Sequence, residues 1–329
     1  MEQINVELIF NWLDKATEMM QEHLNETYLD SLPAAIELLM DDTLFDNLDK
    51  DLASKLSEVE AIKIEAYSPV DIRKAIQLTI LKGMKDSTQP NHLMTPEAVA
   101  LLVGYFAEKL TQDKEELRIL DPVCGTGNLL TTVISQLNKQ TEAYGSEVDP
   151  TLIQIALTSA NAQRINIELF QQDSLRPLFI DPVDLVIADL PVGYYPDDLR
   201  ANEFELKATE GHSYAHHLLI EQSIHYTKDD GYLIFLIPEF LFSSEQSDQL
   251  HSFIQKYANI IGVIRLPDSA FKAGKNVKNI FIIQKKGEKE APKQPLLVNL
   301  PSLKNTAGMN DILEQMNEWF RNYQEQYMQ

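Results

Sequence analysis

Apolar residues repeat at helical spacing in the first part of the chain and change to short runs beyond residue 115. From Ile4 to about Met40 the spacing predicts helices, and another helical pattern begins at Pro69. The later runs alternate with helical stretches, which is typical of a mainly parallel sheet with helices on both faces. The runs are Arg118–Leu120, Ala143–Gly145, Ile167–Phe170, Val183–Ala188, Tyr232–Ile237, Ile260–Leu266 and Asn279–Ile283, and the helical stretches are Leu129–Leu137, Thr151–Arg164, Ser213–Tyr226 and Ser247–Tyr257.

A turn-rich break over residues 83–91 separates these two patterns. We therefore predict a helical domain over residues 1–87 and an α/β domain over residues 88–329. Just after the break, Thr95 is placed to cap a helix that has Pro96 at its first position and runs to about Leu110. The tail from Ile312 to Tyr323 indicates a closing amphipathic helix that packs on the core.

Composition narrows the class of protein. The 329 residues are 44% hydrophobic, which supports a sizeable core, and no apolar run approaches the roughly 20 residues that span a bilayer. Cys124 is the one cysteine, so it forms no internal disulfide, and we expect it to pack rather than react. The first residues lack a secretory signal pattern. A cytoplasmic protein without a membrane partner is the expectation.

The formal net charge of -22 bears on possible partners. Residues 1–60 hold 15 acidic and three basic residues, whereas residues 264–286 hold six basic residues and one acidic residue. Binding to nucleic acid draws on lysines and arginines that neutralise phosphates. We therefore expect an acidic helical domain with a supporting or docking role, and a DNA substrate would require a partner protein.

Candidate chemistry begins at the glycine loop, residues 121–127, with glycines at 125 and 127. Glycine there permits a turn and lets a ligand approach the main chain, although many plain turns have the same spacing. An acidic residue follows each of the first four runs: Asp121, Glu147, Asp173 and Asp189. Ligands in doubly wound sheets bind at these carboxyl ends, and a carboxylate at the second strand accepts hydrogen bonds from ribose hydroxyls.

Two cofactors compete for such a site. A nicotinamide dinucleotide requires a third glycine where Leu130 stands, and Asp121 would repel its pyrophosphate. A ligand with a cationic amine would instead pair with Asp121, while Glu147 would hold its ribose and Asp173 its base. S-adenosylmethionine fits this description, and a dehydrogenase becomes the more distant alternative.

The sequence at residues 121–127, Asp-Pro-Val-Cys-Gly-Thr-Gly, resembles the first motif of class I S-adenosylmethionine-dependent methyltransferases. The form is that of adenine-specific DNA methyltransferases, especially type I modification subunits. Residues 92–96, 145–147, 172–175, 263–267 and 279–281 are similar to further family segments in the same order. The resemblance covers roughly residues 88–290. It implies a doubly wound, Rossmann-like, seven-stranded, mostly parallel sheet, and a helical amino-terminal domain also occurs in the family. The cofactor-binding residues that it implies are Thr95, Asp121, Pro122, Cys124, Gly125, Thr126, Gly127, Asn128, Leu129, Glu147, Val148, Asp173, Ser174, Leu175 and Asp189.

The catalytic motif departs from the family pattern. The family has Asn, Asp or Ser, then Pro-Pro and an aromatic residue, so that a side chain and a backbone carbonyl hold the exocyclic amine while the ring stacks on the base. Here the motif is Asp189-Leu190-Pro191-Val192. Leu190 keeps the carbonyl, but Val192 offers no stacking face. We assign catalysis to Asp189, Leu190 and Pro191, with Tyr194 or, alternatively, Tyr195 as the stacking ring.

The function predicted from these motifs is S-adenosylmethionine-dependent methyl transfer to an exocyclic amine, with DNA adenine as the leading substrate. No inserted segment is large enough to read a DNA sequence, so a separate specificity protein would be required. The alternatives are a methyltransferase with another substrate and a regulatory protein that binds the cofactor without catalysis. No metal is predicted at histidines 212, 216 and 217, because no cysteine or carboxylate lies at ligand spacing on the same helix face and two adjacent histidines point apart on a helix. The oligomeric state is left open.

Overall fold

The computed structural model describes residues 2–86, 94–271 and 277–327. The chain forms two compact units, one of Met1–Met94, Cys124–Thr131 and Glu147–Gln171, the other of Thr95–Val123, Thr132–Ser146 and Gln172–Gln329. The helices are α1 (Glu2–Leu24), α2 (Tyr28–Met40), α3 (Lys50–Leu56), α4 (Pro69–Asp86), α5 (Glu97–Leu110), α6 (Asn128–Ile134), α7 (Pro150–Ala162), α8 (Asp198–Ala201), α9 (Ala215–His225), α10 (Ser247–Tyr257) and α11 (Thr306–Tyr327). The strands are β1 (Glu116–Asp121), β2 (Gln140–Glu147), β3 (Glu168–Gln171), β4 (Val183–Asp189), β5 (Thr227–Pro238), β6 (Ala258–Arg265), β7 (Lys278–Lys285) and β8 (Leu296–Asn299). The predicted boundary at residue 87 falls outside the described residues.

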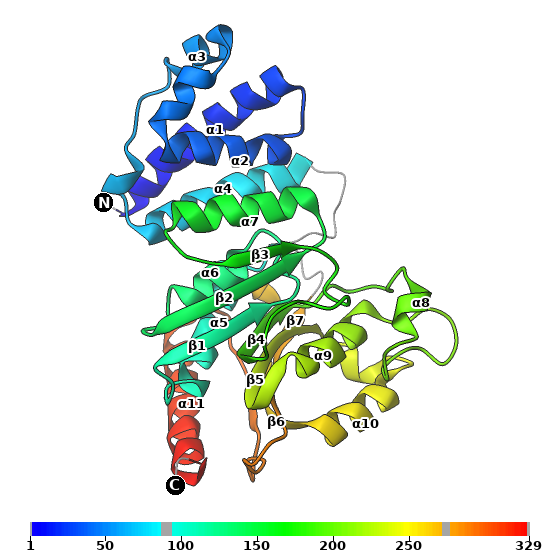
Figure 1. Ribbon diagram of the computed structural model, residues 1–329. Coiled ribbons are helices and arrows are strands. Elements are labelled where there is room, and N and C mark those ends of the chain that lie inside the picture. Colours follow the sequence, from blue (N-terminus) through cyan, green and yellow to red (C-terminus); the bar gives the residue numbers. More distant parts are fainter. Residues whose placement is uncertain (1, 87–93, 272–276, 328–329) are drawn as a thin grey trace. The chain divides into compact units, whose positions relative to one another are not determined.

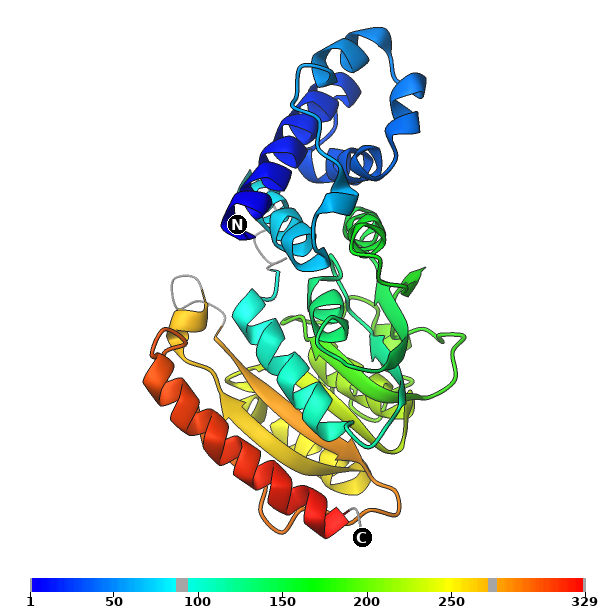
Figure 2. The same cartoon turned by 90° about the vertical axis from the view of Figure 1, so that its left-hand side faces the viewer.

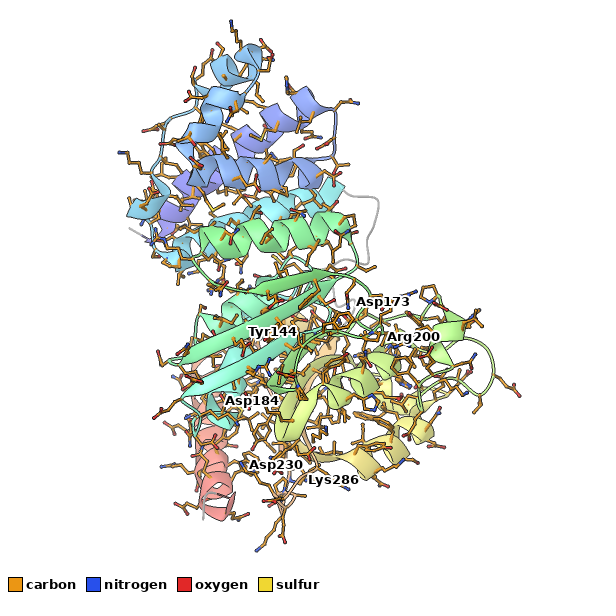
Figure 3. All side chains as sticks on the ribbon, in the orientation of Figure 1. Tyr144, Asp173, Asp184, Arg200, Asp230 and Lys286 are labelled. Atoms are coloured by element: carbon orange, nitrogen blue, oxygen red, sulfur yellow. The ribbon has the colours of Figure 1, made fainter. Side chains whose placement is uncertain are left out.

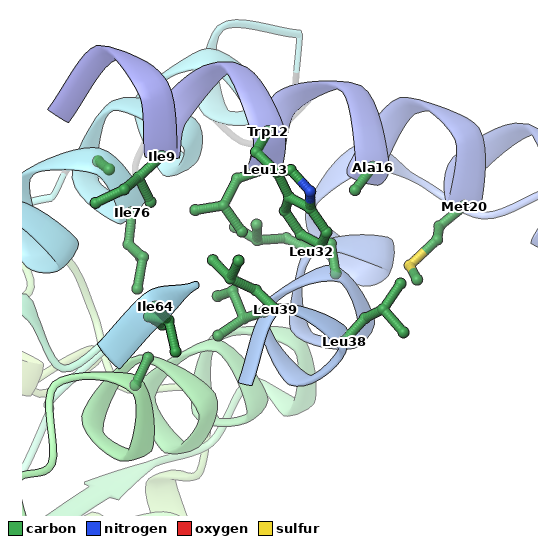
Figure 4. Close-up of a cluster of buried hydrophobic side chains, with 14 of the residues drawn as sticks. Ile9, Trp12, Leu13, Ala16, Met20, Leu32, Leu38, Leu39, Ile64 and Ile76 are labelled. Atoms are coloured by element: carbon green, nitrogen blue, oxygen red, sulfur yellow. The ribbon is translucent and has the colours of Figure 1, made fainter. Parts of the chain in front are cut away.

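The first unit is built around one apolar core. Helix α1 packs on α2 and α4, and α2 packs in turn on α7. Trp12 and Leu13 of α1 and Leu39 of α2 are buried in the cluster that Figure 4 shows. Ile155 of α7 belongs to the same cluster. Burial of this many large aliphatic side chains is the main stabilising contribution to the unit. The amino-terminal helices therefore share their core with a helix that follows β2 in the sequence.

The sheet has eight strands in the order β3-β2-β1-β4-β5-β7-β6-β8 (Figure 1). Strand β1 pairs in parallel with β2 and β4, and β4 pairs in parallel with β5. Strand β7 is antiparallel to both β5 and β6. The Rossmann-like, mostly parallel fold is thus confirmed, and all seven predicted runs are strands. The sequence missed an eighth strand, β8, because it is only four residues long and follows a segment with two prolines.

Helices cover both faces of the sheet in the second unit. Helices α5 and α11 lie on one face, whereas α9 and α10 lie on the other (Figures 1 and 2). Tyr105 and Phe106 of α5 contact the ring of Phe320 of α11 at centroid distances of 6.1 and 6.2 Å. The tail helix therefore packs on the core as predicted. Within the described ranges, no helix is long and apolar enough to cross a membrane.

Candidate functional site

The glycine loop has the backbone that its glycines predict. Gly125 and Gly127 adopt φ angles of +53° and +75°, and the Gly127 amide donates to the Cys124 carbonyl at 2.8 Å. A Cβ atom on Gly127 would lie 3.2 Å from the Cβ of Ala156 in α7, whereas one on Gly125 would meet nothing within 4 Å. Gly127 therefore serves the turn and the packing, while Gly125 leaves open space beside the main chain.

Glu147 closes this loop from the end of β2. Its Oε2 accepts the Gly125 amide at 3.0 Å, and its Oε1 accepts the amides of Val148 and Asp149 at 2.8 and 2.9 Å. A carboxylate has about four acceptor positions, so the contacts among the described residues use three and leave one on Oε2. Glu147 thus fixes the loop through three backbone amides.

The amino-terminal helices reach the same loop. Gln77 of α4 donates from Nε2 to Oδ1 of Asn128 at 2.5 Å, and both side chains are buried. The predicted cofactor residues Cys124, Thr126 and Leu129 are also buried, whereas Val148 is exposed. Asn128 therefore belongs to the scaffold of the loop, which the helical region supports directly.

In the second unit, Asp121 and Pro122 lie at the end of β1. Asp121 is buried, and its Oδ1 accepts the Val123 amide at 3.1 Å. The Pro122 carbonyl accepts a short hydrogen bond from the hydroxyl of Ser174, which is likewise buried. This bond ties the end of β1 to the segment that follows β3 in the sequence.

Asp173 connects two of the predicted motifs. Its Oδ1 accepts the Leu175 amide at 2.9 Å, and its Oδ2 accepts the hydroxyl of Tyr195 at 2.5 Å. Burial and the neighbouring carboxylate raise the pKa of Tyr195 above its ordinary value. Arg200, labelled with Asp173 in Figure 3, donates from Nε to the Leu175 carbonyl at 2.7 Å. Tyr195 is therefore a buried hydrogen-bonding residue and does not offer a stacking face.

Asp189 ends β4 with both carboxylate oxygens engaged. Oδ2 accepts the Thr95 hydroxyl at 2.6 Å, and Oδ1 forms a short ion pair with Nζ of Lys278. The prediction that Thr95 caps α5 was wrong. Helix α5 begins at Glu97, its cap position is Pro96, and no side chain caps it. The hydroxyl bonds a carboxylate instead, which is the stronger acceptor.

The next residue, Leu190, has its side chain fully buried and its amide bonded to the Leu236 carbonyl at 3.1 Å. Its own carbonyl accepts Nζ of Lys278 at 2.9 Å. The Asp189 carboxylate and the Leu190 carbonyl thus converge on the side-chain nitrogen of Lys278. Pro191 and Val192 follow on the surface, and Val192 is half-exposed.

An aromatic stack flanks this motif. The backbones of Tyr194 and Tyr214 form a β-bridge, and their rings stack at 4.9 Å with an interplanar angle of 11°. Tyr214 covers one face of the Tyr194 ring. Because Tyr194 is 59% exposed, much of its remaining surface is open. The ring of His216 continues the stack at 5.0 Å from Tyr214.

His216 and His217 are buried beneath the stack, and their ring centroids lie 4.9 Å apart. The expectation that these rings point apart was wrong, because both side chains pack into the interior from the first turn of α9. Burial lowers the pKa of His216 to about 4, against an opposing effect of the Pro191 backbone, and lowers that of His217 to about 3. Both are therefore neutral at pH 7. No cluster of metal-ligating side chains occurs in the part of the chain that the structure describes.

The structure groups the predicted residues in two sets. The first unit holds Cys124, Gly125, Thr126, Gly127, Asn128, Leu129, Glu147 and Val148, and the second holds Thr95, Asp121, Pro122, Asp173, Ser174, Leu175, Asp189, Leu190, Pro191 and Tyr194. Sequence reasoning missed Lys278 and Tyr214. The one signal for Lys278 was the basic strip at residues 264–286, which we attributed to no site.

Two protein-family models together match nearly the whole chain. A family model described as N-6 DNA Methylase matches residues 85–328, and a model described as YtxK N-terminal helical domain matches residues 7–84. The uncharacterized protein YtxK of Bacillus subtilis (strain 168) is 46% identical over 327 residues, which cover 98% of this chain and 99% of that protein.

Solved structures extend the comparison. A provisionally assigned class I S-adenosylmethionine-dependent methyltransferase from Listeria monocytogenes is 42% identical with a TM-score of 0.89, over 96% of this chain and 99% of that one. The methyltransferase subunit of a type I restriction-modification system from Streptococcus thermophilus has a TM-score of 0.63 at 15% identity, over 93% and 73% of the two chains. At that identity the second likeness concerns the fold alone.

Proposed function

The chain belongs to the N-6 DNA methylase family, and from this premise we propose that it transfers a methyl group from S-adenosylmethionine to an exocyclic amine, with DNA adenine as the leading substrate. The observation that carries the proposal is that the Asp189 carboxylate and the Leu190 carbonyl both bind the side-chain nitrogen of Lys278. The family to which the chain belongs is a family of methyltransferases. The acceptor and the cofactor are the proposed parts.

The residues of the first unit fit the cofactor in two respects. Open space at Gly125 lets a ligand approach the main chain, and the remaining acceptor of Glu147 Oε2 suits one ribose hydroxyl. Asp121 and Asp173 are the further carboxylates that we assign to the cofactor's amine and its adenine base. When bound, S-adenosylmethionine supplies an activated methyl group.

The residues of the second unit orient the acceptor. Asp189 Oδ1 and the Leu190 carbonyl would each accept one N–H of the amine, which fixes the direction of the nitrogen lone pair. Asp189 can also receive the proton that the nitrogen loses on methylation. Tyr194, five residues after Asp189, replaces the missing aromatic residue of the motif, because its ring is exposed while Val192 has no π-face.

The acidic charge of the chain determines what a DNA substrate would require. A formal net charge of -22 leaves few cations for phosphates. We propose that a partner protein supplies these contacts and reads the DNA sequence. The Streptococcus thermophilus protein of similar fold is described as the methyltransferase subunit of a type I restriction-modification system. We place the protein in the cytoplasm, where such a partner and DNA are accessible.

Titration calorimetry with S-adenosylmethionine tests the cofactor assignment. Glu147→Gln removes the charge and one acceptor, so we expect roughly tenfold weaker binding, about 1.4 kcal/mol. Asp149→Asn is the matched control, since Asp149 caps α7 two residues away and asparagine also caps. Equal binding by wild type and Glu147→Gln would contradict the assignment.

Methylation-sensitive sequencing of DNA from cells with and without the gene tests the acceptor. Lost adenine methylation in the deletion strain is the expected result, restored by the wild-type gene and not by Asp189→Ala. A second candidate function, cofactor binding without catalysis, is favoured by Leu190 and Val192, which stand where the family motif has proline and an aromatic residue. Cofactor binding with unchanged adenine methylation, and no transfer to other amines, would establish that candidate instead.

A further inference from the structure

Lys278 is the first residue of β7, and it pairs with Pro238 at the end of β5. Its side chain is 15% exposed, and Asp189 beside it is 18% exposed. The ammonium donates to Asp189 Oδ1 and to the Leu190 carbonyl, the latter at 2.9 Å. The nitrogen of Lys278 thus lies at the position where the proposed function requires the nitrogen of the substrate.

This occupant is held more firmly than a neutral amine would be. Both hydrogen bonds are charge-assisted, and such bonds are roughly twice as strong as neutral ones. The Thr95 hydroxyl takes the other oxygen of Asp189, so the carboxylate cannot turn to offer a fresh acceptor without losing that bond. An external amine therefore has to displace Lys278 before it can bind.

We propose that Lys278 is a built-in occupant of the amine site, which keeps Asp189 and the Leu190 carbonyl closed to external amines until its side chain moves away. The inference rests on the proposed function, because the same two acceptors hold the substrate amine there. The Lys278 side chain is thus a gate that closes that site. The gate makes the free protein inactive toward an amine until Lys278 is displaced.

Lys285 provides a matched control at the other end of the same strand. Its Nζ donates to the Thr227 carbonyl at 2.8 Å and lies 3.4 Å from an oxygen of Asp229. It therefore also joins a carbonyl and a carboxylate, but neither belongs to the predicted catalytic motif. Its side chain is 25% exposed.

The experiment compares Lys278→Ala, Lys278→Met and Lys285→Ala with wild type, using 2′-deoxyadenosine and ethylammonium as probes. Calorimetry measures nucleoside binding, and thermal unfolding measures stabilisation by ethylammonium, with tetramethylammonium as a cation that has no N–H donor. Lys278→Met retains the apolar stem, so it serves if the alanine variant does not fold.

We expect the nucleoside to bind Lys278→Ala or Lys278→Met at least tenfold more tightly than wild type or Lys285→Ala, which is the order of one such hydrogen bond. The N6,N6-dimethyl nucleoside, which lacks N–H donors, should show no gain. Ethylammonium, unlike tetramethylammonium, should stabilise Lys278→Ala saturably.

The two probes test two claims separately, namely that Lys278 closes the amine site and that adenine is the substrate. Binding of ethylammonium without the nucleoside supports the gate and counts against adenine as the substrate. Folded Lys278 variants that bind neither probe better than wild type would overturn the gate. Cofactor binding, measured on the same samples, then reports separately on the proposed function.

Discussion

The glycine loop and the acceptor loop, residues 189–195, follow two neighbouring parallel strands, β1 and β4, yet they are determined in different ways. The glycine loop depends on backbone angles and close packing, and the glycines that satisfy them are visible in the sequence. The acceptor loop depends on Lys278, which is 89 positions from Asp189 in the chain. A local motif thus sets the backbone of the first loop, which Glu147 then closes, whereas a contact with the distant Lys278 sets the state of the second.

The largest expected effect separates two roles within the glycine loop. Gly127→Ala should lower the free energy of unfolding by about 3 kcal/mol, because a Cβ at positive φ adds strain and presses on Ala156. Gly125→Ala adds strain of only about 1 kcal/mol, since its Cβ meets open space. Urea unfolding monitored by circular dichroism measures both changes.

For the affinity of the two glycine variants for the cofactor, we expect the opposite order, with the larger loss in Gly125→Ala. The Cβ of Gly125→Ala enters the space that we assign to the ligand, so this stable variant should bind S-adenosylmethionine at least tenfold more weakly. Wild-type affinity in Gly125→Ala would show that the ligand does not approach the loop there. The comparison between a structural and a functional glycine would then fail.

A second effect concerns the buried histidines behind the acceptor loop. With a pKa of about 3 against an ordinary 6.5, folded His217 binds fewer protons than unfolded His217 between those pH values. Its contribution to stability is therefore complete above pH 6.5 and is lost as the pH falls toward 3. At pH 5 the loss amounts to at most about 2 kcal/mol.

His217→Gln removes this titration. Between pH 7 and pH 5 its free energy of unfolding should fall by up to about 2 kcal/mol less than that of wild type, as measured by urea unfolding. His225→Gln, at an exposed position on the same helix, controls for the loss of a histidine side chain. Parallel curves for His217→Gln would show that the buried ring does not control the acid sensitivity of this region.

Much of the fold could be predicted from the sequence because strand runs and helix periods are local patterns. All seven predicted runs are strands, and the resemblance to the methyltransferase family is confirmed by the family match over residues 85–328. Thr95 was misplaced because a cap and a distant carboxylate compete for one hydroxyl, and spacing favours the nearer partner. The rings of His216 and His217 meet because the protein interior surrounds the start of α9, which helix geometry alone does not reveal.

The smallest expected effect tests the stacking ring of the acceptor loop, and it requires the gate to be open. In the Lys278→Met background, Tyr194→Ala should weaken 2′-deoxyadenosine binding about fivefold, close to 1 kcal/mol, because a base loses one aromatic face. Tyr194→Phe keeps the face and should bind as its parent does. The expected change is at the low end for a stacked base, since Tyr214 already covers one side of the ring. If Tyr194→Ala and Tyr194→Phe bind the nucleoside equally well, the base does not stack on Tyr194. The acceptor loop would then lack the stacking ring that the family motif has where Val192 stands. Weaker binding by Tyr194→Ala alone would mean that the loop keeps its stacking ring at a displaced position.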